Sequence, residues 1–183
     1  MPLPTPTLHA DRLLLRPFTP ADARPLTALM TDPVVLPYWD APPWRDDSRA
    51  ERFLAMCRQL TDEGTGARLA VERSEDGAFI GWLSLTRWDP DFRSATLTVV
   101  FAEAVWGRGY ATEAAGALLR WAYATLDLNR VQAEADTRNA VCARVLGKLG
   151  FRLEGTLRED CIVDGVVSDS WVFGLLRRDW SPA

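Results

Sequence analysis

Two glycines flank a single arginine in the stretch WGRGYAT at 106–112, and an apolar helical pattern starts directly after them. Glycine costs roughly 1 kcal/mol relative to alanine inside a helix, so a pair at a helix entrance needs an explanation. One explanation is a tight turn. The other is an anion site, because a helix entrance carries unpaired N–H groups and a bare backbone lets phosphate oxygens approach them. Arg108 would add a permanent cation to such a site.

The glycine turn matches neither of two common nucleotide motifs. No Gly-Lys-Ser/Thr follows Gly109, which excludes an ATP-binding P-loop, and Thr112 stands where the dinucleotide fingerprint needs glycine. A second stretch, at 138–151, begins with Asn139 at a helix-cap position and ends with glycine and an aromatic residue. It follows the turn by one strand, so Asn139 and Arg144 could lie beside the same ligand. Alternatively, Asn139 is an ordinary helix cap.

The scarcity of histidine narrows the chemistry. His9 is the only histidine and lies in a proline-rich leader, which argues against a histidine base, a Ser-His-Asp triad and a multi-histidine metal site. The cysteines Cys57, Cys142 and Cys161 are scattered and form no CxxC pair. They predict neither a disulfide framework nor a zinc site, so we expect no metal.

Charge and hydropathy restrict the partners. The formal net charge is −4, and no block of basic residues appears, which argues against nucleic-acid binding. No apolar stretch is long enough to span a bilayer, and the N-terminus lacks the pattern of a secretory signal. We therefore expect a cytoplasmic protein that binds neither nucleic acid nor membrane.

The hydrophobic periodicity predicts the order of the elements. Strands are expected at 12–18, 67–74, 79–88, 95–102, 130–136, 151–160 and 170–176, and helices at 19–32, at 46–64, for about four turns from Tyr110, and after Asn139. Thr19 is the expected cap of the first helix, and Gly150 is placed to end the last one. This order predicts one α/β domain over 1–183, with about seven strands in a mixed, mostly antiparallel sheet and four helices on its faces.

The motifs, in this order, resemble the GCN5-related N-acetyltransferase (GNAT) superfamily, and more narrowly its RimJ/RimL-type ribosomal-protein N-terminal acetyltransferase branch. The resemblance is carried by RLLLRPFTPAD at 12–22, IGWLSL at 80–85, WGRGYATEA at 106–114, NAVCARVLGKLGF and RLEG within 139–155, and DSWVFGLLRRDW at 169–180. It implies that acetyl-CoA, or another acyl-CoA, is the co-substrate. The coenzyme contacts would come from Val99, Val100, Phe101, Trp106, Gly107, Arg108, Gly109, Tyr110, Ala111, Thr112, Asn139 and Arg144.

The resemblance also implies a reaction by direct attack of an amine on the thioester. A main-chain N–H at Phe101 would polarise the carbonyl. Many members of the superfamily protonate the leaving thiolate with a tyrosine at the position that Leu146 occupies here. Cys142, three residues after the asparagine, could donate that proton instead, or it could simply pack on the apolar side of its helix. Glu134, Glu103 and Asp160 are candidates for the base.

The acceptor is expected at an aromatic, proline-rich stretch at 36–44, which could also be only a lid over the core. The expected contacts are Tyr38, Trp39, Trp44, Trp88 and Asp89. Acidic residues there would suit a primary amine, either a protein N-terminus or a small molecule. The alternative is a non-catalytic acyl-CoA sensor or interaction module. Exposed tryptophans would suit a homodimer.

Overall fold

One eight-stranded sheet organises the chain, and the computed structural model describes residues 3–46 and 48–181 of it. The spatial order of the strands is β1-β2-β3-β4-β5-β6-β8-β7, and every neighbouring pair is antiparallel except β5 and β6. The strands are β1 (Leu8–His9), β2 (Leu13–Pro17), β3 (Ala67–Arg73), β4 (Ala78–Asp89), β5 (Ser94–Phe101), β6 (Arg130–Asp136), β7 (Arg152–Val163) and β8 (Val166–Leu176). The helices are α1 (Ala23–Thr31), α2 (Ser48–Glu63), α3 (Tyr110–Thr125) and α4 (Ala140–Lys148).

The expected fold class is confirmed, with small differences at the ends of elements. The additional strand is β1, where Leu8 pairs with Leu15 of β2. Two residues are too few to show a period-2 pattern, so the proline-rich leader hid this strand. The first helix also starts later than expected, because Pro20–Asp22 form a 3-10 turn in which the Thr19 N–H donates to Asp22 Oδ2 at 2.7 Å.

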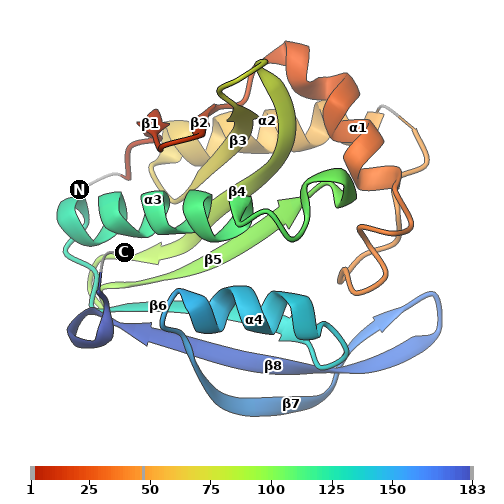
Figure 1. Ribbon diagram of the computed structural model, residues 1–183. Coiled ribbons are helices and arrows are strands. Elements are labelled where there is room, and N and C mark those ends of the chain that lie inside the picture. The colour runs from red at the N-terminus through yellow and green to blue at the C-terminus, as the bar shows by residue number, and fades with distance from the viewer. Residues whose placement is uncertain (1–2, 47, 182–183) are drawn as a thin grey trace.

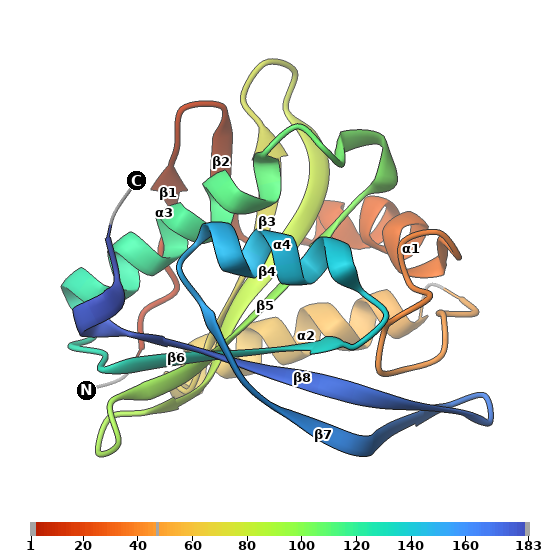
Figure 2. The same ribbon diagram turned by 60° about the horizontal axis from the view of Figure 1, so that its bottom comes forward.

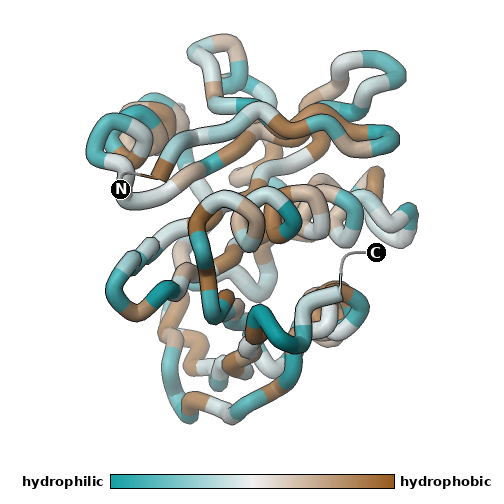
Figure 3. The backbone as a smooth tube through the Cα atoms, turned by 90° about the vertical axis from the view of Figure 1, so that its left-hand side faces the viewer, coloured by the Kyte–Doolittle hydropathy of each residue, from teal (hydrophilic) through white to brown (hydrophobic). Residues whose placement is uncertain are grey.

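Helices cover both faces of the first five strands (Figure 1). Along β4, Leu83 and Leu85 point into the larger core beneath α3, whereas Trp82 points into a second core beneath α1 and α2. This alternation follows from the two-residue period of a strand. Figure 3 shows hydrophobic residues along much of the strands and hydrophilic ones at exposed loops and turns.

Helix α4 has the two ends that the sequence predicts. Asn139 Oδ1 accepts a hydrogen bond from the Cys142 N–H at 3.0 Å, which makes Asn139 the N-cap. After the helix, Gly150 takes φ +90°, and the Phe151 N–H donates to the Leu146 carbonyl at 3.0 Å. This is a Schellman ending, which needs a residue that tolerates positive φ.

The sheet opens between its two parallel strands (Figure 2). β5 pairs with β6 only from Ser94 to Thr96, although β5 stays paired with β4 as far as Phe101. β6 in turn stays paired with β8 as far as Asp136. Each strand therefore continues along its outer neighbour while the two separate, and a gap forms in the middle of the sheet.

Candidate functional site

The end of β5 presents unpaired backbone to the gap. The Ala102 N–H donates to the Ile80 carbonyl at 3.0 Å, so the preceding pair, Phe101 opposite Gly81, occupies a non-hydrogen-bonded position of the ladder. The N–H and carbonyl of Phe101 therefore point away from β4, toward the gap. The carbonyl accepts a hydrogen bond from Trp106 Nε1 at 2.8 Å, which leaves the N–H directed at the gap.

Glycine is required at position 81 for this arrangement. A Cβ added there would lie 2.3 Å from the Val100 carbonyl oxygen and 3.0 Å from the Phe101 Cα. Any side chain would push β4 away from β5 at the point where the gap begins. Gly81 thus permits the close approach that fixes the exposed edge of β5.

The glycine turn at the start of α3 is open to solvent. Gly107 has φ +74° and Gly109, the N-cap of α3, has φ +82°, conformations that favour glycine. As a glycine, the N-cap Gly109 has no side chain with which to cap this end of the helix. The amides of the first helical turn are therefore directed outward from a positive helix end.

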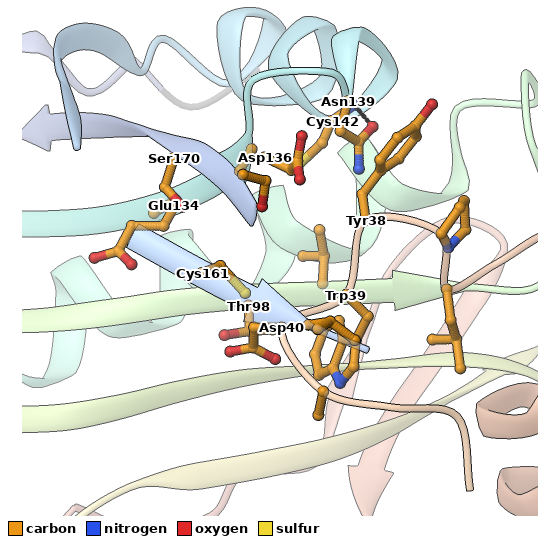
Figure 4. Close-up of a pocket in the computed structure, with 18 of the residues that line it drawn as sticks. Tyr38, Trp39, Asp40, Thr98, Glu134, Asp136, Asn139, Cys142, Cys161 and Ser170 are labelled. Carbon is orange, nitrogen blue, oxygen red and sulfur yellow. Dashed lines mark hydrogen bonds between the residues drawn. The ribbon is translucent and has the colours of Figure 1, made fainter. Parts of the chain in front are cut away.

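A cavity of about 1130 Å³ lies on the other side of the gap. Its walls come from the 33–43 loop, from β4, β5, β6 and β8, from the start of α4 and from the β7–β8 hairpin. Figure 4 shows side chains of the loop, of β6 and of α4 pointing into this common space. Ser84, Thr96 and Thr98 lie along its sheet wall.

Carboxylates converge on this cavity from three elements. Burial raises the pKa of the Cys161 thiol, and nearby carboxylates raise it further. Those carboxylates belong to Asp40, Asp160 and Asp136. Among the described residues, no salt bridge involves Asp40, Asp160 or the further lining carboxylate Glu134. Acidic residues outnumber basic ones on the cavity wall, where Arg68, Arg87 and Arg138 are the lining arginines among the described residues.

Asp136 differs from the other carboxylates because Arg138 neutralises it. Its side chain is only 7% exposed and accepts bonds from Arg138 Nε at 2.9 Å and Nη2 at 2.6 Å. The hydrogen bonds from Arg138 lower the pKa of Asp136, which makes it a poor proton acceptor. The Arg138 guanidinium also lies 5.6 Å from the Tyr38 ring centroid and so links the 33–43 loop to the start of α4.

The structure brings some of the expected residues together at the cavity and places others elsewhere. Lining residues include Tyr38, Trp39, Val99, Asn139 and Cys142, and also the base candidates Glu134 and Asp160. The side chains of Val100 and Phe101 are buried in the two cores, and the 106–112 turn lies outside the cavity wall. Arg144 and Glu103 are exposed and do not line the cavity. Burial raises the pKa of Cys142 to about 11.

Trp44, Trp88 and Asp89 do not line the cavity. Trp44 packs on Phe53 beneath α2, with ring centroids 5.8 Å apart. Trp88 packs against the opposite core, because the β4–β5 register shifts between Thr86 and Asp89 and Arg87 takes φ +51°. This bulge reverses the alternation that would otherwise put Trp88 on the same face of β4 as Trp82.

Sequence reasoning missed several cavity residues. Thr98, Ser84 and Asp136 all sit at positions that the period-2 pattern of their strands assigns to one face, so this signal was present in the sequence. Arg138 and Asp40 lie in connections, where periodicity gives no information.

Comparison with known proteins identifies the family. A family model described as the acetyltransferase (GNAT) domain matches residues 12–152. The chain belongs to the GNAT family. This match confirms the expected superfamily and makes the protein an acetyltransferase.

Relatives support the same assignment. An uncharacterized N-acetyltransferase, p20 of Bacillus licheniformis, is 30% identical over 175 residues, which span 96% of this chain and 98% of that one. A putative ribosomal N-acetyltransferase of Bacillus subtilis, YdaF, is 33% identical over 105 residues, 57% of either chain, in agreement with a RimJ-like branch. A crystal structure of Vibrio cholerae spermidine N-acetyltransferase with CoA and spermine has a TM-score of 0.81 at 22% identity and shares the fold over 92% of this chain and 97% of that one.

The described residues show neither a spanning helix nor a metal-binding cluster. Within 3–46 and 48–181, no helix combines the length and the apolar character needed to cross a bilayer. In the same part of the chain, no three His, Cys, Asp or Glu side chains are grouped as metal ligands.

Proposed function

We propose that this acetyltransferase transfers an acetyl group from acetyl-CoA to a cationic primary amine, either a protein N-terminus or a small molecule. The observation that supports this proposal most strongly is the gap between β5 and β6. One of its edges offers unpaired backbone N–H groups beside the open end of α3. The cavity behind it is lined by Asp40, Glu134 and Asp160, which form no salt bridge within the described part of the chain.

The residues around the gap fit the coenzyme. The amides of 107–112 would hold the diphosphate, because the glycines leave the backbone bare and the N-cap Gly109 has no side chain to occupy the helix end. The edge of β5 at Val99 and Phe101 would pair with the amide-containing arm. Asn139 uses one acceptor position of its side-chain oxygen as a helix cap, and its NH2 group would be the donor that it offers to a ligand. Arg144 would lie on the coenzyme side of α4.

The coenzyme supplies the thioester, and the protein would supply position and charge. The amine nitrogen forms a bond to the acyl carbon, and the bond from that carbon to sulfur breaks. CoA leaves as a thiolate, and the proton that the nitrogen loses on becoming an amide balances the one that the thiolate takes up. Holding both reactants across the gap can contribute about 7–11 kcal/mol. The Phe101 N–H, aimed at the gap, would stabilise the developing oxyanion by about 3 kcal/mol.

An ammonium acceptor must lose a proton before it attacks. Glu134 and Asp160 are the remaining base candidates on the cavity wall, since Glu103 lies away from it. Such proton transfer typically contributes about 10²–10⁴-fold in rate. Asp136 is unsuited to this role because the hydrogen bonds from Arg138 lower its pKa and make it a weak base.

Thiol release from acetyl-CoA tests the proposed activity. The acceptor panel contains peptides with free N-termini, spermidine and, as the uncharged control, an N-terminally acetylated peptide without a free amine. We expect release with at least one cationic acceptor and none with the control. Tight CoA binding without release across the whole panel would instead support a non-catalytic acyl-CoA sensor.

A charge-removing variant tests the acceptor side. Asp160→Asn should raise the acceptor KM roughly threefold or more and leave the acetyl-CoA KM unchanged, because only the cavity loses a charge. Asp62→Asn, an equal change on the exposed side of α2, is the matched control. An unchanged acceptor KM in Asp160→Asn would show that the acceptor does not bind in this cavity.

A further inference from the structure

Arg12 joins the start of β2 to the first turn of α3. Its backbone N–H donates to Glu113 Oε1 at 2.7 Å, and its side-chain Nε donates to Glu113 Oε2 at 2.8 Å. Arg12 Nη2 lies 2.6 Å from the same Oε2. One carboxylate of α3 is therefore held by one arginine more than 100 residues earlier in the chain.

The same guanidinium lies against the glycine turn. Arg12 Nη1 donates to the Arg108 carbonyl at 3.2 Å, and the guanidinium carbon sits 4.3 Å from the centroid of the Tyr110 ring. A Cβ added at Gly109 would lie 3.6 Å from Arg12 Nη2. The Arg12 side chain thus lies against three consecutive residues of the turn, Arg108, Gly109 and Tyr110.

The negative charge of Glu113 lies close to the glycine turn, and Arg12 compensates it. The Glu113 side chain is 16% exposed and belongs to the first turn of α3, where the helix end is positive. A diphosphate at the turn would use the same positive potential and would be repelled by a bare carboxylate. The paired Arg12 cancels that charge and directs the Arg108 carbonyl toward itself, away from an incoming anion.

We propose that Arg12 is a positioning residue for the coenzyme diphosphate, acting through Glu113 and the Arg108 carbonyl. The inference rests on the proposed function, because it assumes that the 107–112 turn holds the diphosphate. It assigns a role to the first part of the 12–22 motif, which lies in sequence far from both the turn and the cavity.

The test compares a donor that has the diphosphate with one that lacks it. CoA affinity is measured by calorimetry, and kcat/KM is measured with acetyl-CoA and with acetyl-pantetheine. The variants are Arg12→Ala, Glu113→Gln and the double variant, together with Arg12→Lys. Arg93→Ala, which breaks an exposed ion pair with Asp127 at 3.0 Å, is the matched control.

We expect Arg12→Ala to weaken CoA binding ~10-fold, since an uncompensated charge remains near the diphosphate. Glu113→Gln in the Arg12→Ala background should restore most of that loss. The kcat/KM for acetyl-pantetheine should stay within about twofold of wild type in every variant. Should Arg12→Ala fail to fold, Arg12→Lys, which keeps the charge without the forked contacts, should weaken CoA binding by a smaller factor.

Three results would overturn the inference: unchanged CoA affinity in Arg12→Ala and Arg12→Lys, an equal loss with acetyl-pantetheine, or no recovery in the double variant. A wild-type protein that binds no CoA at all would instead refute the proposed function, and the inference with it. The wild-type titration therefore separates the two failures.

Discussion

The two sides of the gap are built differently. Strands β1 to β5 have helices on both faces, and β3 is buried along most of its length. Strands β6 and β8 pack one face against α4 and the larger core, whereas the edge strand β7 is exposed along almost its whole length. Strands β1 to β5 thus provide a fixed edge at the end of β5. Strands β6 to β8 provide an open wall on which charged residues can remain accessible to solvent.

The largest difference between the two sides of the gap should appear in how much a leucine-to-alanine substitution lowers the free energy of unfolding. Leu83→Ala, at a fully buried position of β4, should lower the free energy of unfolding by about 3 kcal/mol, because it leaves a cavity in a packed core. Leu157→Ala, at a 43% exposed position of β7, should lower it by less than about 1 kcal/mol. Urea denaturation of both variants measures the contrast, and equal losses would contradict the described packing.

Two glycine-to-alanine substitutions, one in β4 at the gap and one in α4, should have opposite effects on stability. Gly81→Ala should destabilise by about 2 kcal/mol, because its Cβ would collide with the Val100 carbonyl, and it should raise the acetyl-CoA KM. Gly147→Ala, in α4 with no atom near the added Cβ, should stabilise by roughly 0.5–1 kcal/mol and leave KM unchanged. Thermal unfolding and donor kinetics of both variants measure these effects. A tolerated alanine at position 81 would show that the edge of β5 is not fixed by this contact.

Acid stability should depend on the end of β6. The pKa of Asp136 is lowered in the folded protein, chiefly by Arg138, so its contribution is present above the unfolded value of about 3.9 and is lost as pH falls through the folded pKa. Asp136→Asn should therefore flatten the fall in stability below about pH 4, and Asp62→Asn should not. Urea midpoints measured across this range give the slopes. Identical slopes in wild type and Asp136→Asn would contradict the pairing.

The smallest effect is expected at Cys142. Burial raises its pKa to about 11, so the thiol stays protonated at neutral pH but is a weaker acid than an exposed cysteine. We expect Cys142→Ala to keep kcat within about threefold of wild type. A larger loss in Cys142→Ala that Cys142→Ser recovers would assign the proton-donor role to this position after all.

Much of this architecture follows from the sequence, for identifiable reasons. Long amphipathic segments such as α3, the cap at Asn139 and the ending at Gly150 depend on local chemistry, and each was predicted at or near its position. Trp88 was expected among the acceptor contacts. A bulge at Arg87 turns the Trp88 side chain to the face of the larger core, and no local sequence pattern predicts such a bulge. The contacts of Arg12 join segments about 100 residues apart, which periodicity cannot detect.

The most direct test concerns the edge of β5 and the turn after it. Amide hydrogen exchange, followed residue by residue with and without saturating CoA, reports which backbone N–H groups the coenzyme covers. We predict slower exchange at Val99, Phe101 and 107–112, and little change along β7. Unchanged exchange at these amides, with protection elsewhere in the chain, would contradict the placement of the coenzyme in the gap.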